Sequence, residues 1–490
     1  MPLSDDLLRG VKASFVSRIV DMAANGLLVV LLAGYLLGPD QYGLLFLTLS
    51  IFAVAQLFAD LGIARSAARY VSEFKEVEPA QIPHIIAISL RYRVALIGIV
   101  CMAVILGRDL IADILSEPAL GTLLLLGTLF LAFQSLKIYH VTLFQGFKKV
   151  QFSALVTIVD NVTRLGFVVT FVVLGWGVVG ALLGYVISSL VAAMLALVIL
   201  YIRFYRTFER AEKPAERLRR RIAEYSVPLA ASRSANVVDK EFDIILIGFF
   251  LNPAAVGFYT LGKQISEFVE APAGSVGFAL SPAYGEEKAN DQLDRAARLY
   301  ETTLSYVLVL YIPAVVGLVI VAEPAILIVF GEEYLDAVLV LQVLGAFVFF
   351  KALNSITTQS LDYLGRARHR AIAKGVTSAA NFGLNIVLIP TMGVVGAAIA
   401  TVITFGIYSL ANVYIMHREL RLRWDRILRT MSAATAISII IGGCVVFLTP
   451  YISGFFSLIG VVMVGVILWA VLATASGLVD VERAAVAIRA

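Results

Sequence analysis

The sequence predicts an all-α polytopic membrane protein with about fourteen transmembrane helices, in two repeated six-helix bundles followed by two C-terminal helices. Composition gives the class, because hydrophobic residues make up 60% of the 490-residue chain and charged residues only 15%. Mean hydropathy is +0.90, and a soluble domain carries about 25% charged residues. Apolar segments of about 20 residues, the length that crosses a bilayer, follow one another along the chain. The third observation is an internal repeat.

Tight turns that contain glycine or proline separate the apolar segments. Gly38-Pro39 follows the first segment, and Gly175-Trp176-Gly177 joins the fifth to the sixth so closely that the two should form a hairpin. The predicted helices cover residues 14–36, 43–66, 84–107, 119–145, 151–174, 177–202, 226–250, 257–280, 299–322, 336–361, 371–390, 393–416, 427–449 and 454–475.

The two halves of the chain share short motifs. Residues 37–43, LGPDQYG, are echoed by residues 251–257, LNPAAVG, and the motif GVVGA at 177–181 returns at 393–397. Such repeats are typical of transporters, in which two bundles face each other across a substrate site. The predicted domains are an N-terminal six-helix bundle at 1–204, a basic cytoplasmic linker at 205–225, a C-terminal six-helix bundle at 226–417, and two additional helices with a cytoplasmic tail at 418–490.

Loop charges predict the orientation, because the cytoplasmic loops of membrane proteins are enriched in lysine and arginine. With the N-terminus inside and the sides alternating, one basic loop residue, Arg108, falls outside, and the others fall inside. An even number of helices then leaves both termini in the cytoplasm, and we expect the plasma membrane as the location. The basic linker is either a solvated amphipathic connector or a surface that binds anionic lipid headgroups.

Several kinds of site are disfavoured. Cys101 and Cys444 both lie in apolar segments, so neither a disulfide framework nor a metal site is supported, and the four histidines are dispersed. The GxxxxGK stretch at 257–263 continues with Gln264 and opens an apolar helix, which a nucleotide-binding loop does not do. We therefore expect no cofactor, no metal, no catalytic residue and no nucleic-acid partner.

Ionisable residues inside the apolar segments are the candidate functional residues, because a charge at the centre of a transmembrane helix costs about 2.5–3.5 kcal/mol on insertion scales. Asp160 and Arg164 are four residues apart and are expected to pair along one helix. Lys137 and Lys351, which are 214 residues apart, have no acidic residue three or four positions away. These two lysines either line a cationic cavity or pair with acids on other helices.

A cavity with several cations would bind an anion, and a phosphate or pyrophosphate is the natural candidate, since arginine forms forked hydrogen bonds and lysine offers a point charge. Acids in the same region would serve H⁺ or Na⁺ coupling or act as structural counter-ions, and the sequence leaves both interpretations open. The predicted substrate-binding residues are Arg18, Lys137, Arg233, Lys263 and Lys351. The predicted coupling residues are Asp21, Asp239, Asp243, Glu267 and Glu270.

Three stretches of the chain resemble the polysaccharide flippases of the MOP exporter superfamily, relatives of the lipid II flippase and of the MATE drug exporters. They are LLGPDQYG at 36–43, DIILIGFF at 243–250 with VGFY at 256–259, and NFGLNIVLIP at 381–390 running into MGVVGAAIAT at 392–401. The resemblance covers nearly the whole chain. It implies a V-shaped pair of six-helix bundles around a central cavity, alternating access, and a cationic cavity that the five basic residues above could supply.

The resemblance also implies the cargo, an oligosaccharide on a polyprenyl (dolichol or undecaprenyl) phosphate or pyrophosphate. It would pass from the cytoplasmic to the outer leaflet for surface glycan or glycoprotein assembly. The stretch DYLGRAR at 362–368 resembles archaeal members, which implies dolichol and surface-layer N-glycosylation. Implied partners are the lipid-linked oligosaccharide, membrane lipids, and glycosyltransferases or an oligosaccharyltransferase of the same pathway, and we expect a monomer. The alternatives are a MATE-like ion-coupled drug exporter and a membrane glycan polymerase or glycosyltransferase.

Overall fold

The chain is helical throughout the residues that its computed structural model describes, 5–209, 211–290 and 292–478, apart from short turns and connecting loops. The all-α fold class is therefore confirmed. The chain divides into two compact units, Met1–Gly257 and Phe258–Ala490. The predicted domain boundaries rest on the sequence repeat and stay a prediction, and the end of the predicted tail, 479–490, lies outside the described residues.

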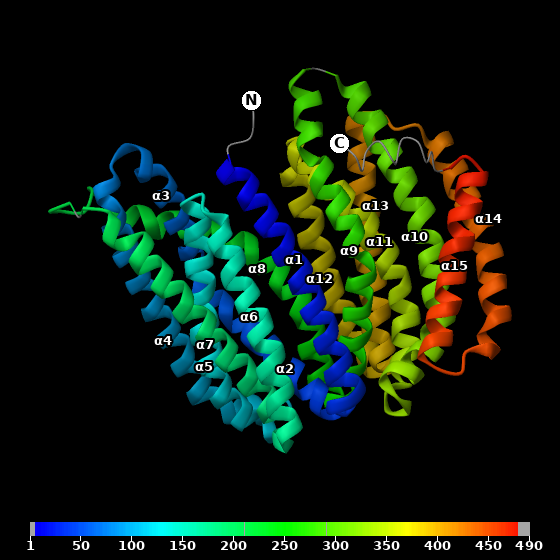
Figure 1. The fold of residues 1–490 in the computed structure, drawn as a ribbon, viewed down its shortest axis with the longest axis horizontal. Helices are drawn as coiled ribbons and strands as arrows, with labels where there is room; N and C mark the ends of the chain where they lie inside the picture. Colours follow the sequence, from blue (N-terminus) through cyan, green and yellow to red (C-terminus); the bar gives the residue numbers. More distant parts are fainter. Residues whose placement is uncertain (1–4, 210, 291, 479–490) are drawn as a thin grey trace. The chain divides into compact units, whose positions relative to one another are not determined.

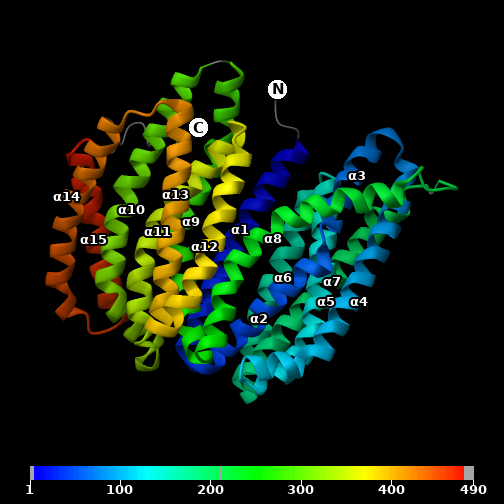
Figure 2. The ribbon, with the colours of Figure 1, turned by 180° about the vertical axis from the view of Figure 1, so that it is seen from behind.

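The first unit contains the helices α1 to α8 and the start of α9. Its α-helices are α1 (Asp5–Leu31), α2 (Pro39–Asp60), α3 (Ile63–Val77), α4 (Ile82–Ile114), α5 (Ala119–Gly146), α6 (Val150–Phe171), α7 (Gly177–Arg203) and α8 (Leu218–Phe250). α6 and α7 form the predicted hairpin, α5 packs on both, and α4 lies against α5 (Figure 1 and Figure 2). α1 lies along α6, and α8 packs on α2, α3 and α4.

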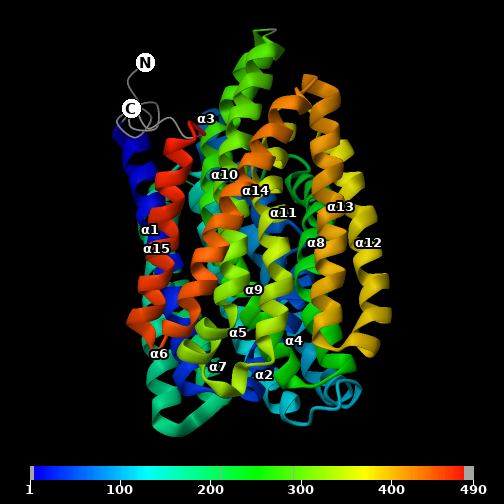
Figure 3. The ribbon, with the colours of Figure 1, turned by 90° about the vertical axis from the view of Figure 1, so that its right-hand side faces the viewer.

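The second unit continues from α9, which begins in the first. Its α-helices are α9 (Pro253–Ala289), α10 (Leu293–Phe330), α11 (Ala337–Tyr363), α12 (Ala367–Met392), α13 (Val394–Leu420), α14 (Trp424–Leu448) and α15 (Phe455–Ala475). α11 packs on α10 and on α13, and α13 forms a hairpin with α12. The last two helices form a hairpin beside α10, as Figure 3 shows.

Short helical turns connect or extend these helices. They are the π-helical η1 (Leu32–Leu36) and η3 (Val172–Trp176), and the 3₁₀ turns η2 (Pro79–Gln81), η4 (Tyr205–Thr207), η5 (Glu332–Tyr334) and η6 (Thr449–Tyr451).

Eleven helical stretches among the described residues are long and apolar enough to cross a membrane. One of them, Val150–Thr207, contains two of the predicted segments, and α8 and α9 are not among the eleven. These findings establish a multi-pass membrane protein. The count of fourteen transmembrane helices stays a prediction.

The predicted helix over 43–66 is divided in the structure. α2 ends at Asp60 because Leu61 and Gly62 adopt left-handed backbone conformations, with φ of 40° and 78°. The following helix, α3, buries Ala67, Tyr70 and Val71 at helical spacing. Its opposite face is polar, so α3 is an amphipathic helix rather than the end of a transmembrane segment.

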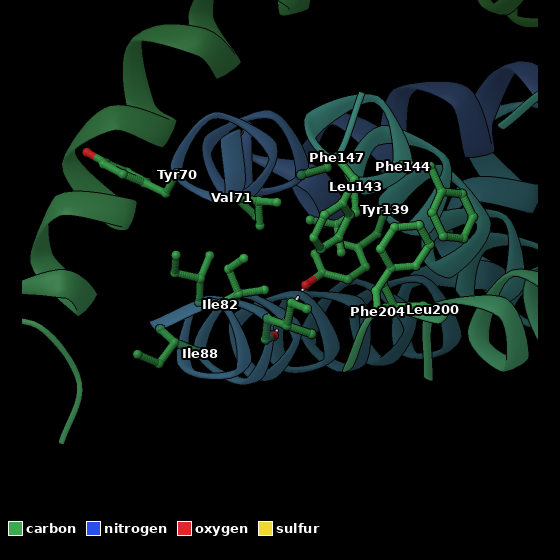
Figure 4. Packing of buried hydrophobic residues seen from close by; sticks show 14 of the residues in the cluster. Tyr70, Val71, Ile82, Ile88, Tyr139, Leu143, Phe144, Phe147, Leu200 and Phe204 are labelled. Carbon is green, nitrogen blue, oxygen red and sulfur yellow. Dashed lines mark hydrogen bonds between the residues drawn. The ribbon is translucent and has the colours of Figure 1, made fainter. Parts of the chain in front are cut away.

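An aromatic and aliphatic core holds α3, α4, α5 and α7 of the first unit together (Figure 4). Phe147 and Phe204 lie with their ring centroids 4.4 Å apart. Tyr139 is fully buried, and its hydroxyl lies 2.7 Å from the hydroxyl of Ser89 and 3.2 Å from the carbonyl oxygen of Ile86. The one polar atom of this ring is thus satisfied inside the core, as buried hydroxyls require.

The last two helices are fastened to α10 by polar contacts. Glu301 is only 2% exposed and accepts hydrogen bonds from the backbone N–H of Arg423 at 2.8 Å and from its guanidinium at 3.0 Å. In the second half of α15, the indole N–H of Trp469 donates to the carbonyl oxygen of Val309 at 2.8 Å. The two additional C-terminal helices therefore pack as part of the second unit.

The repeat seen in the sequence recurs in the backbone. Gly177, the first residue of α7, has φ 51° and ψ −137°, and Gly393, the residue before α13, has φ 63° and ψ −148°. A side chain is strained at positive φ, so both hairpins depend on glycine at the same point. The shared GVVGA motif therefore encodes one turn, used twice.

A second repeated glycine allows two helices to cross closely. Within the first unit, a Cβ atom on Gly43 of α2 would overlap the carbonyl oxygen of Pro253, at the start of α9. A Cβ atom on Gly257 would meet the carbonyl oxygen of Pro39 and the backbone nitrogen of Gly43. The echoed motifs at 37–43 and 251–257 thus pack against each other, each with its glycine against the backbone of the other.

Enlarging this crossing should destabilise the fold. We expect Gly43→Val to cost about 1–3 kcal/mol, the usual penalty of overpacking, because backbone atoms cannot move aside as a flexible side chain can. Thermal unfolding of the purified protein in detergent measures the effect. Gly98→Val on α4 is the matched control, because no atom lies within 4 Å of a Cβ placed there. Equal unfolding temperatures for the two variants would contradict the close crossing.

Candidate functional site

The second unit holds a compact charged cluster between α9 and α11. The Nζ atom of Lys351 lies 3.4 Å from Glu267 Oε1 and 3.7 Å from Glu270 Oε2. Ser355, one turn along α11 from the lysine, donates a 2.5 Å hydrogen bond to Glu270 Oε1. The side chain of Glu270 is 10% exposed and that of Lys351 is 23% exposed. One ammonium group therefore faces two carboxylates in a partly buried site.

The helical hydrogen bonding of α9 is interrupted directly after this cluster, and a tyrosine hydroxyl from α10 is inserted there. Pro272 has no N–H and interrupts the helical hydrogen bonds. The N–H of Ala273 donates instead to the hydroxyl of Tyr311 on α10 at 3.0 Å, and that hydroxyl lies 3.0 Å from the carbonyl oxygen of Glu270. An inserted side chain of this kind is a recognised cause of a helix kink. Tyr311 thereby fixes the turn that carries Glu270.

Lys263 lies two turns before Glu270 on the same helix and is 8% exposed. Its Nζ atom is 5.4 Å from the centroid of the Tyr259 ring, and the hydroxyl of that tyrosine is 3.0 Å from Thr401 Oγ1 on α13. Sequence spacing also allows Lys263 to meet Glu267, four residues on. The lysine is held in a polar and aromatic environment inside the second unit, where the ring face offers a favourable position for a cation.

The first unit holds a second charged cluster, where α1, α5 and α6 meet. Lys137 Nζ lies 2.7 Å from Asp160 Oδ2, with the two side chains 12% and 6% exposed. Asp160 was expected to pair with Arg164 along α6, and that expectation is wrong. The lysine takes the carboxylate because its ammonium reaches it from the neighbouring helix, whereas Arg164 turns toward α1.

Amide groups extend this first-unit cluster. Asn161 and Asn25 both donate to Asp21 Oδ1, at 2.9 and 3.0 Å. Arg164 donates to the amide oxygens of Asn25 and Asn161, at 2.9 and 2.6 Å, and lies 5.4 Å from the centroid of the Tyr185 ring. Two groups of contacts thus lie side by side on α6, the Lys137–Asp160 pair with α5 and the Asp21, Asn25, Asn161 and Arg164 network with α1.

A further buried ion pair was not predicted. Arg93 of α4 is fully buried, pairs with Asp60 of α2 and donates to the carbonyl oxygen of Ser135 on α5 at 3.0 Å. Gln56 also reaches Ser135, at 2.6 Å. The contact joins three helices within the core of the first unit, so we assign it a structural role. Asp60 was visible as a polar residue in an apolar segment, but nothing in the sequence spacing connects it to Arg93.

The remaining predicted residues are distributed between the two units. Arg18 is exposed on α1, one turn before Asp21, and Asp243 is buried on α8. Both make interactions with other residues. The side chains of Arg233 and Asp239 lie outside the described part of the structure. Of the ten predicted residues, the structure brings three together in one contact network, namely Lys351, Glu267 and Glu270.

The two clusters share a chemistry. Each contains the lysine of the symmetry-related pair, Lys137 or Lys351, and in each the lysine faces carboxylates from another helix. A lysine held in this way can exchange its carboxylate partner for another anion, because the interaction is that of a mobile point charge. No group of three or more metal-ligating side chains occurs among the described residues.

Charged sites inside apolar helix bundles, together with an internal repeat, are typical of membrane transport proteins. The sequence profile of the polysaccharide biosynthesis protein family matches residues 7–286. This match covers more than half of the chain, so the chain belongs to that family.

Named relatives agree with this assignment. The lipopolysaccharide biosynthesis protein WzxC of Escherichia coli is 27% identical over 351 residues, which are 70% of this chain and 67% of the relative. The probable low-salt glycan biosynthesis flippase Agl15 of Haloferax volcanii is 24% identical over 40% of this chain. The probable flippase AglR of the same organism is 31% identical over 35% of this chain. The matched regions span only 41% and 36% of the two Haloferax proteins.

Solved structures show the same fold. The lipid II flippase MurJ in an inward closed conformation aligns over 95% of this chain and 98% of its own, with a TM-score of 0.76 and 17% identity. An inward-facing multidrug resistance MATE transporter of the MOP superfamily aligns over 84% of this chain and 96% of its own, with a TM-score of 0.67 and 16% identity. The fold is therefore that of the MOP superfamily, as the sequence motifs predicted.

The contribution of the Lys137–Asp160 pair to the free energy of unfolding can be tested. We expect Asp160→Leu to lower the free energy of unfolding by about 3 kcal/mol, because it leaves a buried ammonium without its partner. The double variant Lys137→Met/Asp160→Leu should recover most of this loss, since apolar side chains of similar size replace a buried pair at little cost. Thermal unfolding in detergent checks both values. A double variant as unstable as the single one would show that the pair is not the dominant interaction of either side chain.

The hydrogen bond from the Ala273 N–H to the Tyr311 hydroxyl gives a second test. Tyr311→Phe removes the hydroxyl and leaves the buried N–H of Ala273 without its acceptor, which should cost about 1–3 kcal/mol. Tyr306→Phe on the same helix is the matched control, because that side chain is 40% exposed. Unfolding temperatures of the two variants provide the comparison. If both match the wild type, the inserted hydroxyl does not hold α9 in place.

Proposed function

We propose that the chain is a flippase that moves a lipid-linked oligosaccharide or polysaccharide precursor across the membrane, and that it is a transporter rather than an enzyme. The observation that carries the proposal is the repeated lysine, placed inside each unit and held by carboxylates from a neighbouring helix. Family membership and a MurJ-like fold over nearly the whole chain support it. Three of the similar proteins are named as flippases.

The cargo would be a glycan on a polyprenyl phosphate or pyrophosphate, with dolichol or undecaprenol as the lipid. Transport would run from the cytoplasmic to the outer leaflet by alternating access, for surface glycan or surface-layer glycoprotein assembly. The location would be the plasma membrane with both termini in the cytoplasm, in agreement with the positive loops. A monomer would work beside glycosyltransferases or an oligosaccharyltransferase of the same pathway.

The clusters suggest how an anionic headgroup would be handled. A phosphate that enters the second unit would compete with Glu267 and Glu270 for Lys351, because all three are anions within reach of one ammonium group. Return of the carboxylates to the lysine would then favour release. Lys137 with Asp160 would offer the equivalent exchange in the first unit. Lys263 and Arg18 would supply further positive charge along the path, as would Arg233.

Coupling to H⁺ or Na⁺ belongs to the same proposal. Protonation of Glu267 or Glu270, or a bound Na⁺, would weaken their hold on Lys351 and free it for the phosphate. Asp21, Asp243 and Asp239 are the other acids that could take part. Charged groups inside a membrane protein are costly, so they pair with one another or line an ion pathway. A lysine that exchanges between carboxylate and phosphate partners would stay paired while it takes part in transport.

Export of a cationic drug is the second candidate, favoured by the carboxylates in both clusters and by the MATE-like fold. The two candidates differ in what a deletion strain would show. Loss of a drug exporter would increase sensitivity to cationic compounds and leave lipid-linked glycan unchanged on both leaflets.

The central experiment is deletion of the gene, followed by measurement of lipid-linked oligosaccharide on each leaflet and of glycan on the surface acceptor. We expect lipid-linked glycan to accumulate on the cytoplasmic leaflet and surface glycan to fall. Lys351→Ala should reduce flipping by roughly tenfold or more, the effect of losing one charge-assisted hydrogen bond. Arg298→Gln, an exposed arginine at the start of α10, is the matched control and should complement fully.

Two results would overturn the proposal. Shortened or absent lipid-linked glycan in the deletion strain would place the protein in glycan assembly instead. Full complementation by Lys351→Ala at normal expression would remove the charged cluster from the transport path. The apolar double variant Lys137→Met/Asp160→Leu extends the test to the first unit, because it is expected to fold and should still fail to complement.

A further inference from the structure

An apolar groove of about 620 Å³ runs along the outside of the first unit, between α4 and the end of α7. Its floor includes the buried side chains of Ile86 and Leu200, and its walls include Val94 and Leu197, which are 53% and 40% exposed. Among the described residues that line the groove, none is acidic. The volume lies in the range of small-molecule sites, about 300–1,000 Å³.

The length and place of the groove fit an acyl chain. The lining residues of α4 run from Ile86 to Ala95, which at 1.5 Å per residue is roughly 13 Å along the helix axis. The hydrocarbon of one leaflet is about 15 Å thick. Both α4 and α7 belong to stretches that are long and apolar enough to cross a membrane, and we therefore expect the exposed walls of the groove to face lipid. A chain from a single leaflet would fill the groove.

The groove has a cationic and aromatic end. Tyr201 and Tyr205 line it with their rings stacked at a centroid distance of 6.1 Å, and the guanidinium of Arg206 lies 5.9 Å from the centroid of the Tyr201 ring. Tyrosine and arginine together are typical of the membrane–water interface. Positive loop charge predicts that this end of α7 faces the cytoplasm.

Arg91 is a cation within the lining itself, in addition to Arg206 beside Tyr201. It is exposed on α4 and makes no ion pair with any residue that the structure describes. Side chains on a helix lean toward its N-terminus, and the N-terminus of α4 lies at the same predicted cytoplasmic side as Tyr205. A long arginine side chain can therefore extend its guanidinium toward the headgroups while its stem stays in the groove.

We propose that this groove binds one anionic glycerophospholipid of the leaflet predicted to be cytoplasmic. An acyl chain lies along Val94 and Leu197, and the phosphate is held by Arg91 and Arg206. The occupant follows from charge complementarity: an apolar channel with cations at one end and no acid matches a lipid that joins an acyl chain to an anionic headgroup. This bound lipid is distinct from the transported cargo of the proposed flippase.

The test is native mass spectrometry of the full chain in mild detergent, titrated with phosphatidylglycerol and with phosphatidylcholine of identical acyl chains. We expect phosphatidylglycerol to bind more tightly to the wild type. Arg91→Gln should weaken phosphatidylglycerol binding about fivefold, as expected for loss of one cation near a headgroup. It should weaken phosphatidylcholine binding less, because the choline cation offsets the charge of that phosphate. Ala95→Trp, which fills the groove, should reduce the binding of both lipids.

Matched controls lie on the same helix. Arg108→Gln removes an arginine near the far end of α4, and Ile99→Trp enlarges a side chain that is 65% exposed and does not line the groove. Neither control should change lipid binding, and all four variants alter exposed or half-exposed positions, so their unfolding temperatures should match the wild type. Equal affinity for the two lipids, unaffected by Arg91→Gln, would overturn the proposal. Displacement of phosphatidylglycerol by a tighter-binding polyprenyl phosphate would also overturn it, and would assign the groove to the carrier lipid.

Discussion

A charge placed among apolar helices has to be neutralised by the protein itself, because hydrocarbon offers no water to solvate it. This constraint accounts for the internal architecture of both units. Arg93 meets Asp60, Lys137 meets Asp160, and Lys351 lies between two glutamates. Each of these contacts joins side chains from different helices. The charged residues therefore act as cross-links in bundles whose apolar surfaces would otherwise pack with little preference for one register.

The pairs differ in what they can do. Arg93 is fully buried in its contacts, and rearranging it would leave a charge unpaired in the core. Lys351 has two acidic partners at 3.4 and 3.7 Å and a side chain that is 23% exposed, so it can lose one partner and keep the other. An interaction that tolerates exchange is suited to binding and releasing an anion, whereas one that does not is suited to holding helices together. The same residue types serve both purposes, and burial decides between them.

The backbone reinforces this arrangement at irregular points. Pro272 removes a helical hydrogen bond in the turn that follows Glu270, and the hydroxyl of Tyr311 bonds to the backbone groups of that turn instead. The backbone position of Glu270 therefore depends on contact with α10. Gly177 and Gly393 permit the same sharp turn in each half, and Gly43 and Gly257 permit close crossing of the echoed motifs. Proline and glycine thus set where helices bend and approach, and the Lys351 cluster lies next to one such point, the turn at Pro272.

The sequence by itself determined the all-α membrane class, the repeat and the resemblance to polysaccharide flippases, and the chain belongs to the polysaccharide biosynthesis protein family. These features depend on composition, on segment length and on motifs that recur along one chain, and none of them requires knowledge of which helices pack together. It also identified Lys137 and Lys351 as residues of interest, because each is a charge without a partner on its own helix. Only the tertiary structure decided which carboxylate faces which cation. Asp160 pairs with Lys137 rather than with Arg164, and Arg93 pairs with Asp60, because contacts between helices depend on rotation and packing that periodicity along one helix does not encode.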